Sequence, residues 1–177
     1  LYEIYQFSGM QRSRVCHTIH NFKHQGIAGE NVLWHTGLGR PDYYYELDRM
    51  GDDFNHSAIN FMKGAVTYAN FTTTVSPSHA WEVRHTDWGY GLGHTLHRHH
   101  NKFAGVLNGL DYDMWNPKAD PHIPHHYDIT DLEAKYDNKS ELRKRLLLAD
   151  TYKPIVAYVG RLDSQKGVHL IRHALFY

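Results

Sequence analysis

Arg161 and Lys166 have the types and spacing that best suit the chemistry of a phosphate-containing substrate. They lie in the segment 160–167, between a nearly continuous apolar run and a predicted helix. Two cations and the free N–H groups of a helix N-terminus, gathered at a strand end, form an anion site suited to a diphosphate. The two flanking glycines form neither a Walker-type nor a GxGxxG pattern. Spacing alone therefore leaves two interpretations open, a phosphate site or a solvated loop with two ordinary surface charges.

Polar residues also follow three other predicted strands. The pairs His20-Asn21, Ser76-Pro77 and Asn108-Gly109 each come directly after a β-prone run. Taken singly these are weak signals, because a lone histidine is usually structural and Asn-Gly is a common turn pair. In open parallel sheets, however, ligands bind beyond the carboxyl ends of the strands. The shared position of the three pairs therefore indicates a ligand site at that edge.

A rival interpretation is a metal-binding protein, because the chain contains 16 histidines. Four of them, His94, His97, His99 and His100, form an H-x-x-H-x-H-H cluster, and imidazole is a common zinc ligand. No cysteine pair accompanies the cluster, and the H-E-x-x-H order is absent from the sequence. We therefore expect no metal site.

A second rival is a non-catalytic glucan-binding module. Aromatic residues make up 14% of the chain, and Trp34, Tyr43, Tyr44 and Tyr45 are clustered closely enough to stack on sugars. The alternative for these four residues is that they pack the loop in which they lie, since aromatic side chains fill cores more often than they line sugar sites.

The elements that must position these residues alternate along the chain. Apolar and β-branched runs predict four strands, at 13–19, 71–75, 102–107 and 155–159. Apolar spacing predicts four helices, at 57–70, 77–83, 137–148 and 168–175. The Gly- and Tyr-rich region 26–50 is expected to be mostly loop with one short helix. We therefore predict an α/β fold with parallel sheets, in which the strand at 155–159 is buried.

Composition excludes several classes of protein. Lys and Arg together number 19, as do Asp and Glu, and this balance argues against a nucleic-acid partner. No apolar run approaches the length of a membrane span. The single cysteine, Cys16, excludes an internal disulfide and fits a reducing compartment.

Five segments, in this order, resemble motifs of the glycogen and starch synthases. They are Thr18 to Gly26 (TIHNFKHQG, matching T-[IV]-H-N-x-x-x-Q-G), Thr73 to Pro77 (TTVSP), Gly105 to Asp111 (G-[IV]-L-N-G-[IV]-D), Asn138 to Leu142 (N-K-x-x-L) and Arg161 to Gly167 (R-L-x-x-Q-K-G). The segments INFMKG at 59–64 and YGLGHTL at 90–96 look similar to cyanobacterial glycogen synthases. Order and spacing also fit, so the resemblance covers nearly the whole chain.

The resemblance implies a retaining glycosyltransferase of GT-B architecture, with two Rossmann-like domains and parallel sheets. Such enzymes move glucose from ADP-glucose to the non-reducing end of an α-1,4-glucan, glycogen or starch, and need no cofactor or metal. Carried over by position, Arg161 and Lys166 hold the diphosphate and His20 lies by the transferred glucose. Asn21, Asn108 and Gly109 are then substrate-binding residues on the sugar or phosphate side.

The resemblance also implies a division of the chain. Residues 1–108 correspond to the later part of the N-terminal domain, 109–153 to the hinge and linker helix, and 154–177 to the first strand, loop and helix of the C-terminal domain. Both ends look cut, because the family's K-x-G-G-L loop and its later C-terminal segments are absent from the sequence. We therefore expect this stretch by itself to be inactive. The expected location is the bacterial cytoplasm, or a plastid if the source is a plant or alga.

Overall fold

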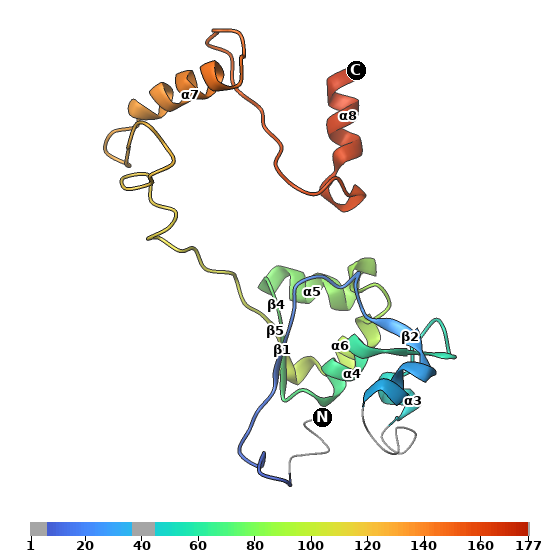
Figure 1. Cartoon of the computed structure of the whole chain (residues 1–177). Coiled ribbons are helices and arrows are strands. Elements are labelled where there is room, and N and C mark those ends of the chain that lie inside the picture. The colour runs from blue at the N-terminus through green and yellow to red at the C-terminus, as the bar shows by residue number, and fades with distance from the viewer. Residues whose placement is uncertain (1–6, 37–44, 177) are drawn as a thin grey trace. The chain divides into compact units, whose positions relative to one another are not determined.

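The computed structural model describes residues 7–36 and 45–176 (Figure 1). The chain divides into two units, residues 1–109 and 110–177, which are described separately. The strands are β1 (Cys16–Ile19), β2 (Ile27–Gly29), β3 (Ala58–Asn60), β4 (Phe71–Thr74) and β5 (Phe103–Gly105). The α-helices are α3 (Leu47–Met50), α4 (Phe61–Tyr68), α5 (Pro77–His85), α6 (Gly93–Arg98), α7 (Ala134–Arg145) and α8 (Val168–Phe176). The 3₁₀ helices are η1 (Glu30–Thr36), η2 (Asp87–Gly89), η3 (His100–Lys102) and η4 (Ser164–Lys166).

A parallel sheet in the order β1-β4-β5 forms the centre of the first unit. Its β-branched residues form strands as expected, and the Thr74 hydroxyl, which is buried, donates a hydrogen bond to the carbonyl of Ile19 at 3.0 Å. The three strands predicted at 13–19, 71–75 and 102–107 are confirmed, although each is shorter than expected. The parallel α/β fold is therefore confirmed in this unit.

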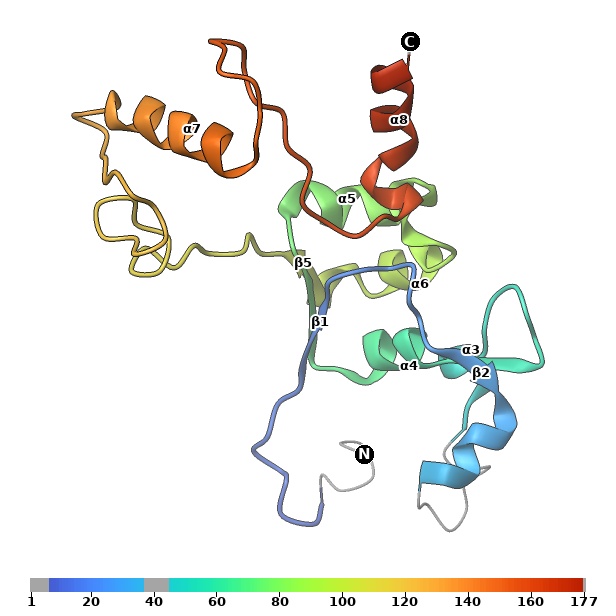
Figure 2. The same cartoon turned by 45° about the horizontal axis from the view of Figure 1, so that its top comes forward.

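Helix α5 begins directly after β4, at the edge where the strands end (Figure 2). The side-chain oxygen of Ser76 accepts a hydrogen bond from the backbone N–H of His79 at 3.3 Å, and Pro77 occupies the first turn, as the sequence predicts. The apolar core combines this helix with the sheet and with α4 and α6. Its buried members are Ile19, Phe22, Val66, Ala80, Val83, Leu92, Leu96 and Phe103.

The helix predicted over 57–70 is wrong in its first part. Residues Ala58–Asn60 form strand β3, which pairs antiparallel with β2, so an additional two-stranded sheet lies where a helix and a loop were expected. Helix α4 begins only at Phe61, because the Asn60 side chain accepts a hydrogen bond from the Lys63 N–H at 2.9 Å and caps it. Ile59 fits the apolar spacing of the helix but is buried within the strand.

In the second unit α7 and α8 agree with the predicted helices, apart from a shift of α7 toward the N-terminus, and the short 3₁₀ helix η4 lies within the predicted loop. The strand predicted at 155–159 is wrong. This segment forms no strand, and the exposed fractions of Val156 and Val159 are 94% and 97%. The physical reason is that a parallel strand needs a neighbour, and residues 110–176 contain none.

Candidate active site at the carboxyl ends of the parallel strands

The register of the sheet aligns three strand ends in the first unit. Ile19 lies beside Thr74, and Thr74 lies beside Gly105, so β1, β4 and β5 end at one edge. His20 follows β1 directly and is exposed, while the carboxamide oxygen of Asn21 accepts a hydrogen bond from the Lys23 N–H at 2.9 Å. The loops after these strands therefore start side by side, as the sequence analysis expected.

Gly105 allows two of these loops to approach each other closely. A Cβ atom at this position would lie 2.0 Å from the backbone oxygen of Ser76 and 2.3 Å from the backbone nitrogen of Pro77. Val106 continues the ladder by donating its N–H to the carbonyl of Thr74 at 2.8 Å. The turn at the start of α5 thus packs against the end of β5. The sequence did not predict this contact, although Gly105 lies in one of the motifs noted above.

Asn108 and Gly109 continue the chain beyond β5 and are both exposed. A Cβ atom at Gly109 would meet no other atom within 4 Å, so no close approach requires glycine there. In the first unit the structure thus brings the loop of His20 and Asn21 to the edge from which the segment of Asn108 and Gly109 departs.

Arg161 and Lys166 belong to the second unit, where both are exposed. The carbonyl of Arg161 accepts a hydrogen bond from the Tyr158 hydroxyl at 2.6 Å, and the Asp163 carboxylate accepts one from the Gln165 N–H at 2.8 Å. Gly167 has φ +71°, a left-handed conformation that turns the chain into α8. The predicted anion-binding loop therefore ends at a helix N-terminus, as the spacing indicated.

A buried polar network supports the loop that follows β1, and sequence reasoning missed it. The Gln25 carboxamide donates hydrogen bonds to the carbonyls of Phe22 and Tyr90, both at 2.9 Å, and accepts one from Asn60 at 2.6 Å. Asn60 also donates to the Asp52 carboxylate at 3.0 Å. Gln25 thus fixes the path of the chain five residues after His20. Its place in the segment Thr18 to Gly26 was the available signal.

The charge of Asp52 is stabilised within this network. Burial opposes ionisation of this carboxyl, but the backbone N–H groups of Asn55 and Phe54, the Asn60 amide and the Lys63 ammonium outweigh that effect and hold its pKa below the usual value. The Lys63 ammonium, itself buried, forms an ion pair with Asp53 at 2.7 Å. Asp52, Asp53 and Lys63 therefore each have a partner, as a buried network requires.

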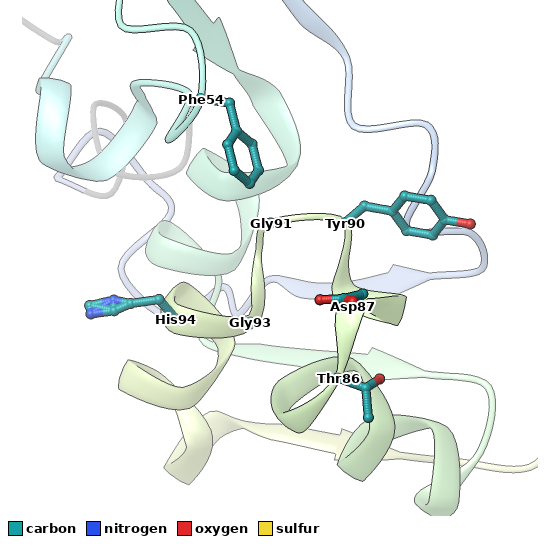
Figure 3. Close-up of a pocket in the computed structure, with 7 residues that line it drawn as sticks. All are labelled: Phe54, Thr86, Asp87, Tyr90, Gly91, Gly93 and His94. Carbon is teal, nitrogen blue, oxygen red and sulfur yellow. The ribbon is translucent and has the colours of Figure 1, made fainter.

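An open cavity of about 540 Å³ lies beside this network. Its lining consists of Phe54, Thr86, Asp87, Tyr90, Gly91, Gly93 and His94. In Figure 3 the Phe54 ring points toward Gly91, whereas Tyr90 and His94 extend to opposite sides. None of the predicted catalytic or substrate-binding residues lines this cavity.

The family model described as the starch synthase catalytic domain matches residues 1–98 of the chain. The chain belongs to this family. Over 177 residues it is 58% identical to glycogen synthase 1 of Trichormus variabilis and 60% identical to glycogen synthase 2 of Methylococcus capsulatus. These alignments cover 100% of this chain and 36% of each relative.

The solved structure of the catalytic domain of starch synthase IV from Arabidopsis thaliana, bound to ADP and acarbose, is also similar. The TM-score is 0.91 at 42% identity, over 99% of this chain and 36% of that chain. The resemblance to glycogen and starch synthases, including those of cyanobacteria, is therefore confirmed, and the chain corresponds to part of a GT-B catalytic domain.

The histidine cluster of this starch synthase family member is dispersed along α6 and η3. His97 and His100 have ring centroids 6.1 Å apart, and the Nδ1 atom of His100 lies 3.0 Å from the carbonyl of His97. Burial, with the charges of Lys102 and Arg98, lowers the pKa of His99. Within residues 7–36 and 45–176, no group of three or more His, Cys, Asp or Glu side chains could hold a metal ion.

The aromatic cluster proposed for a glucan-binding module is only partly described. Trp34 is exposed, Tyr45 is half-buried, and Tyr43 and Tyr44 lie outside the described residues. Burial and the charge of Glu30 raise the pKa of Tyr45. Across the part of the chain that is described, no helix is long and apolar enough to cross a membrane.

Proposed function

We propose that this chain is part of a glycosyltransferase that moves glucose from ADP-glucose to the non-reducing end of an α-1,4-glucan, with retention of the anomeric configuration. The observation that carries the proposal is the similarity, over 99% of the chain, to a starch synthase catalytic domain whose structure is described as bound to ADP and acarbose. The family membership and the glycogen synthase relatives support the same reaction. The chain spans 36% of those relatives, so the transfer belongs to the whole enzyme.

In this proposal the cations act on the departing diphosphate. As the bond between glucose and ADP breaks, negative charge grows on the phosphate oxygens, and a preorganised cation lowers the barrier most at that moment. The exposed side chains of Arg161 and Lys166, with the N-terminus of α8 directly after them, supply positive charge in one loop. These two residues are therefore assigned to the leaving group.

The strand-end residues of the first unit are assigned to the sugar. His20 and Asn21 follow β1 at the edge where ligands bind in open α/β sheets, and Asn108 and Gly109 leave the same edge after β5. His20 would lie beside the transferred glucose, and the other three residues would contact substrate. The proposed domain division, 1–108, 109–153 and 154–177, separates these two groups of residues.

The direct test uses the full-length enzyme that carries this sequence. Labelled glucose from ADP-glucose should appear in glycogen, with chain extension at non-reducing ends. Removal of divalent ions with EDTA and dialysis should leave the rate unchanged, because cationic side chains stabilise the leaving group. A rate that fell on EDTA treatment and returned with zinc or magnesium would favour the metal hypothesis, and glucan binding without any transfer would favour a non-catalytic module.

The proposed place of action follows from the substrate. ADP-glucose and glycogen meet in the bacterial cytoplasm, or in a plastid if the source is a plant or alga, and the probable starch synthase 4 of Arabidopsis thaliana, 43% identical to this chain, is described as chloroplastic or amyloplastic. Fractionation of cells that express a tagged full-length enzyme tests this location.

A further inference from the structure

We propose that the cavity beside Phe54 and Tyr90 is a subsite for an uncharged oligosaccharide, a segment of α-1,4-glucan that is held apart from the residues assigned to transfer. The choice of an α-1,4-glucan rests on the proposed function. The cavity itself lies entirely within the first unit, between the loop that follows Gly51 and the segment that joins α5 to α6.

One continuous set of buried hydrogen bonds holds both sides of the cavity. The Asp52 carboxylate accepts the Phe54 N–H at 3.1 Å and the Asn60 amide at 3.0 Å. Asn60 donates to Gln25 at 2.6 Å, and Gln25 donates to the carbonyl of Tyr90 at 2.9 Å. The exposed fractions of Asp52, Asn60 and Gln25 are only 5%, 2% and 6%, so this frame is shielded from water. The backbones that carry Phe54 and Tyr90 are therefore fixed relative to each other.

The floor of the cavity requires glycine. Gly91 has φ +93°, and a Cβ atom there would lie 2.1 Å from Cε2 of the Phe54 ring. The preceding residue, Tyr90, has φ +48°, a left-handed conformation that is unfavourable for a non-glycine residue. Strain of this kind persists where the surrounding structure over-determines it, and it is frequent at ligand-binding sites. Here the Gln25 hydrogen bond to the Tyr90 carbonyl supplies that support.

Aromatic rings are exposed on this rigid frame. The exposed fraction of Phe54 is 80% and that of Tyr90 is 39%, although Asp52 and Gln25, which bond to their backbones, are buried. In Figure 3 the Phe54 ring points toward Gly91, and the Tyr90 ring extends away from it. The C–H faces of pyranose rings pack on such aromatic surfaces, and rigid aromatic side chains lose little entropy when they bind.

The polar lining favours an uncharged ligand. Thr86, Asp87 and His94 offer a hydroxyl, a carboxylate and an imidazole, which suit the hydroxyl groups of a sugar. No lysine or arginine lines the cavity, whereas phosphate recognition relies on such cations. The Asp87 carboxylate also repels an anion. A nucleotide or phosphate is therefore a poor occupant, and a neutral oligosaccharide is a suitable one.

A subsite of this kind would act on polymers and not on short acceptors. A glucan held at Phe54 has a raised effective concentration at the rest of the enzyme, and this increases affinity without changing the chemical step. A maltose acceptor is too short to use both places. The subsite should therefore affect the KM for glycogen and leave kcat unchanged.

The test compares variants of the full-length enzyme. Phe54→Ala removes an exposed ring, Phe54→Trp retains an aromatic surface, and Trp81→Ala is the matched control because Trp81 is an exposed aromatic residue on α5 that does not line the cavity. We expect Phe54→Ala to weaken binding to glycogen in affinity electrophoresis about tenfold, as loss of a central aromatic contact does. Phe54→Trp and Trp81→Ala should bind glycogen as the wild type does. Affinity for ADP and kcat with maltose should be the same in all four proteins.

The outcomes separate this inference from the proposed function. Unchanged glycogen affinity in Phe54→Ala overturns the subsite, as does an equal loss in Trp81→Ala or a selective loss of ADP binding. If no protein transfers glucose but Phe54→Ala still loses glycogen affinity, the proposed function fails and the subsite stands. A rise in the KM for glycogen about equal to the loss of affinity, with an unchanged melting temperature, supports both.

Discussion

The two units of the chain differ in what holds them together. All described hydrophobic residues that are buried lie in the first unit, around the parallel sheet and helices α4, α5 and α6. In the second unit Arg143 is the buried residue among those described, and its guanidinium donates to the carbonyls of Ala149 and Lys153. The first unit is thus stabilised by apolar burial, and the second by local hydrogen bonds.

The two parts of the proposed site are held by different kinds of contact, long-range in the first unit and short-range in the second. In the first unit the edge at His20 is set by strand register, by Gly105 and by the Gln25 network. In the second unit the loop of Arg161 and Lys166 lies between an exposed, unpaired segment and a helix without buried residues. The contacts of Tyr158 and Asp163 in this loop, with Arg161 and Gln165, are short-range along the chain.

The largest expected effect is a loss of stability when the core of the first unit is truncated, compared with a matched truncation in the second unit. Leu96 is 0% exposed in the core, so Leu96→Ala should lower the free energy of unfolding of this chain by about 2–5 kcal/mol. Val156 is 94% exposed, so Val156→Ala should change it by less than about 0.5 kcal/mol. Urea unfolding of both variants beside the parent chain gives the comparison. Equal effects would mean that Val156 is buried in solution, and the contrast between the units would fail.

The second prediction concerns catalysis, for which the larger effect is expected in the second unit. In the full-length enzyme, Arg161→Ala and Lys166→Ala should each lower kcat by about 10²–10³, or roughly 3–4 kcal/mol, because each removes a charge that stabilises the leaving group. Both side chains are exposed, so the melting temperatures should be unchanged. Lys166→Arg should also be slow, since a planar guanidinium does not replace a compact ammonium. Wild-type rates in both alanine variants would mean that Arg161 and Lys166 are ordinary surface charges in a solvated loop.

A third prediction compares the helix starts of the two units. Ser76 caps α5 through its side-chain oxygen, so Ser76→Ala should lower the free energy of unfolding by about 1 kcal/mol. Glu133 precedes α7 without a side-chain cap hydrogen bond, so Glu133→Ala should have an effect within about 0.5 kcal/mol. Thermal melts monitored by circular dichroism measure both. A loss in Glu133→Ala as large as that in Ser76→Ala would contradict the assigned caps.

The sequence predicted best those elements whose signals are local. β-branched residues at 71–75 and the Ser76-Pro77 start are sufficient for β4 and α5, because a strand run and a helix cap are read within a few residues. Strand β3 was missed because its apolar residues also fit helical spacing. The strand at 155–159 was wrong because pairing depends on a second segment, which an apolar run cannot specify.

The candidate site shows the same division. The position of His20 at a strand end could be predicted, since it requires only one strand and its end. The role of Gln25 could not, because its partners Asn60 and Tyr90 lie 35 and 65 residues away along the chain. The cavity beside Phe54 is lined by Phe54 and by residues between Thr86 and His94, which are far from Phe54 along the chain. No single motif could therefore predict it.

The smallest expected effect concerns two carboxyl groups with lowered pKa values, one in each unit. Burial opposes the charge of Asp52, but backbone N–H groups, Asn60 and Lys63 lower its pKa overall. The hydrogen bond from Lys118, together with those of Thr130, lowers the pKa of Asp128. A group whose pKa is lower in the folded state stabilises the protein above its unfolded pKa, and this contribution is lost as the pH falls through the folded value. Any such contribution is therefore present at neutral pH and lost in acid, and its size depends on how far solvent screens the carboxyl group.

The two carboxyl groups should nevertheless differ in size of effect. Asp52 is buried and bonded to the frame of Gln25 and Asn60, so Asp52→Asn should lower stability at pH 7 and make the acid branch of the stability curve shallower. The ion pair of Asp128 with Lys118, 2.6 Å long, lies at the surface, where solvent and salt screen it. Asp128→Asn should therefore match the parent at about 0.15 M salt. Urea unfolding between pH 3 and pH 7, both rough limits chosen around the usual carboxyl pKa, measures the two curves. If Asp128→Asn flattened the acid branch more than Asp52→Asn did, the second unit would hold the stronger electrostatic contact, and the contrast between buried and local stabilisation would be reversed.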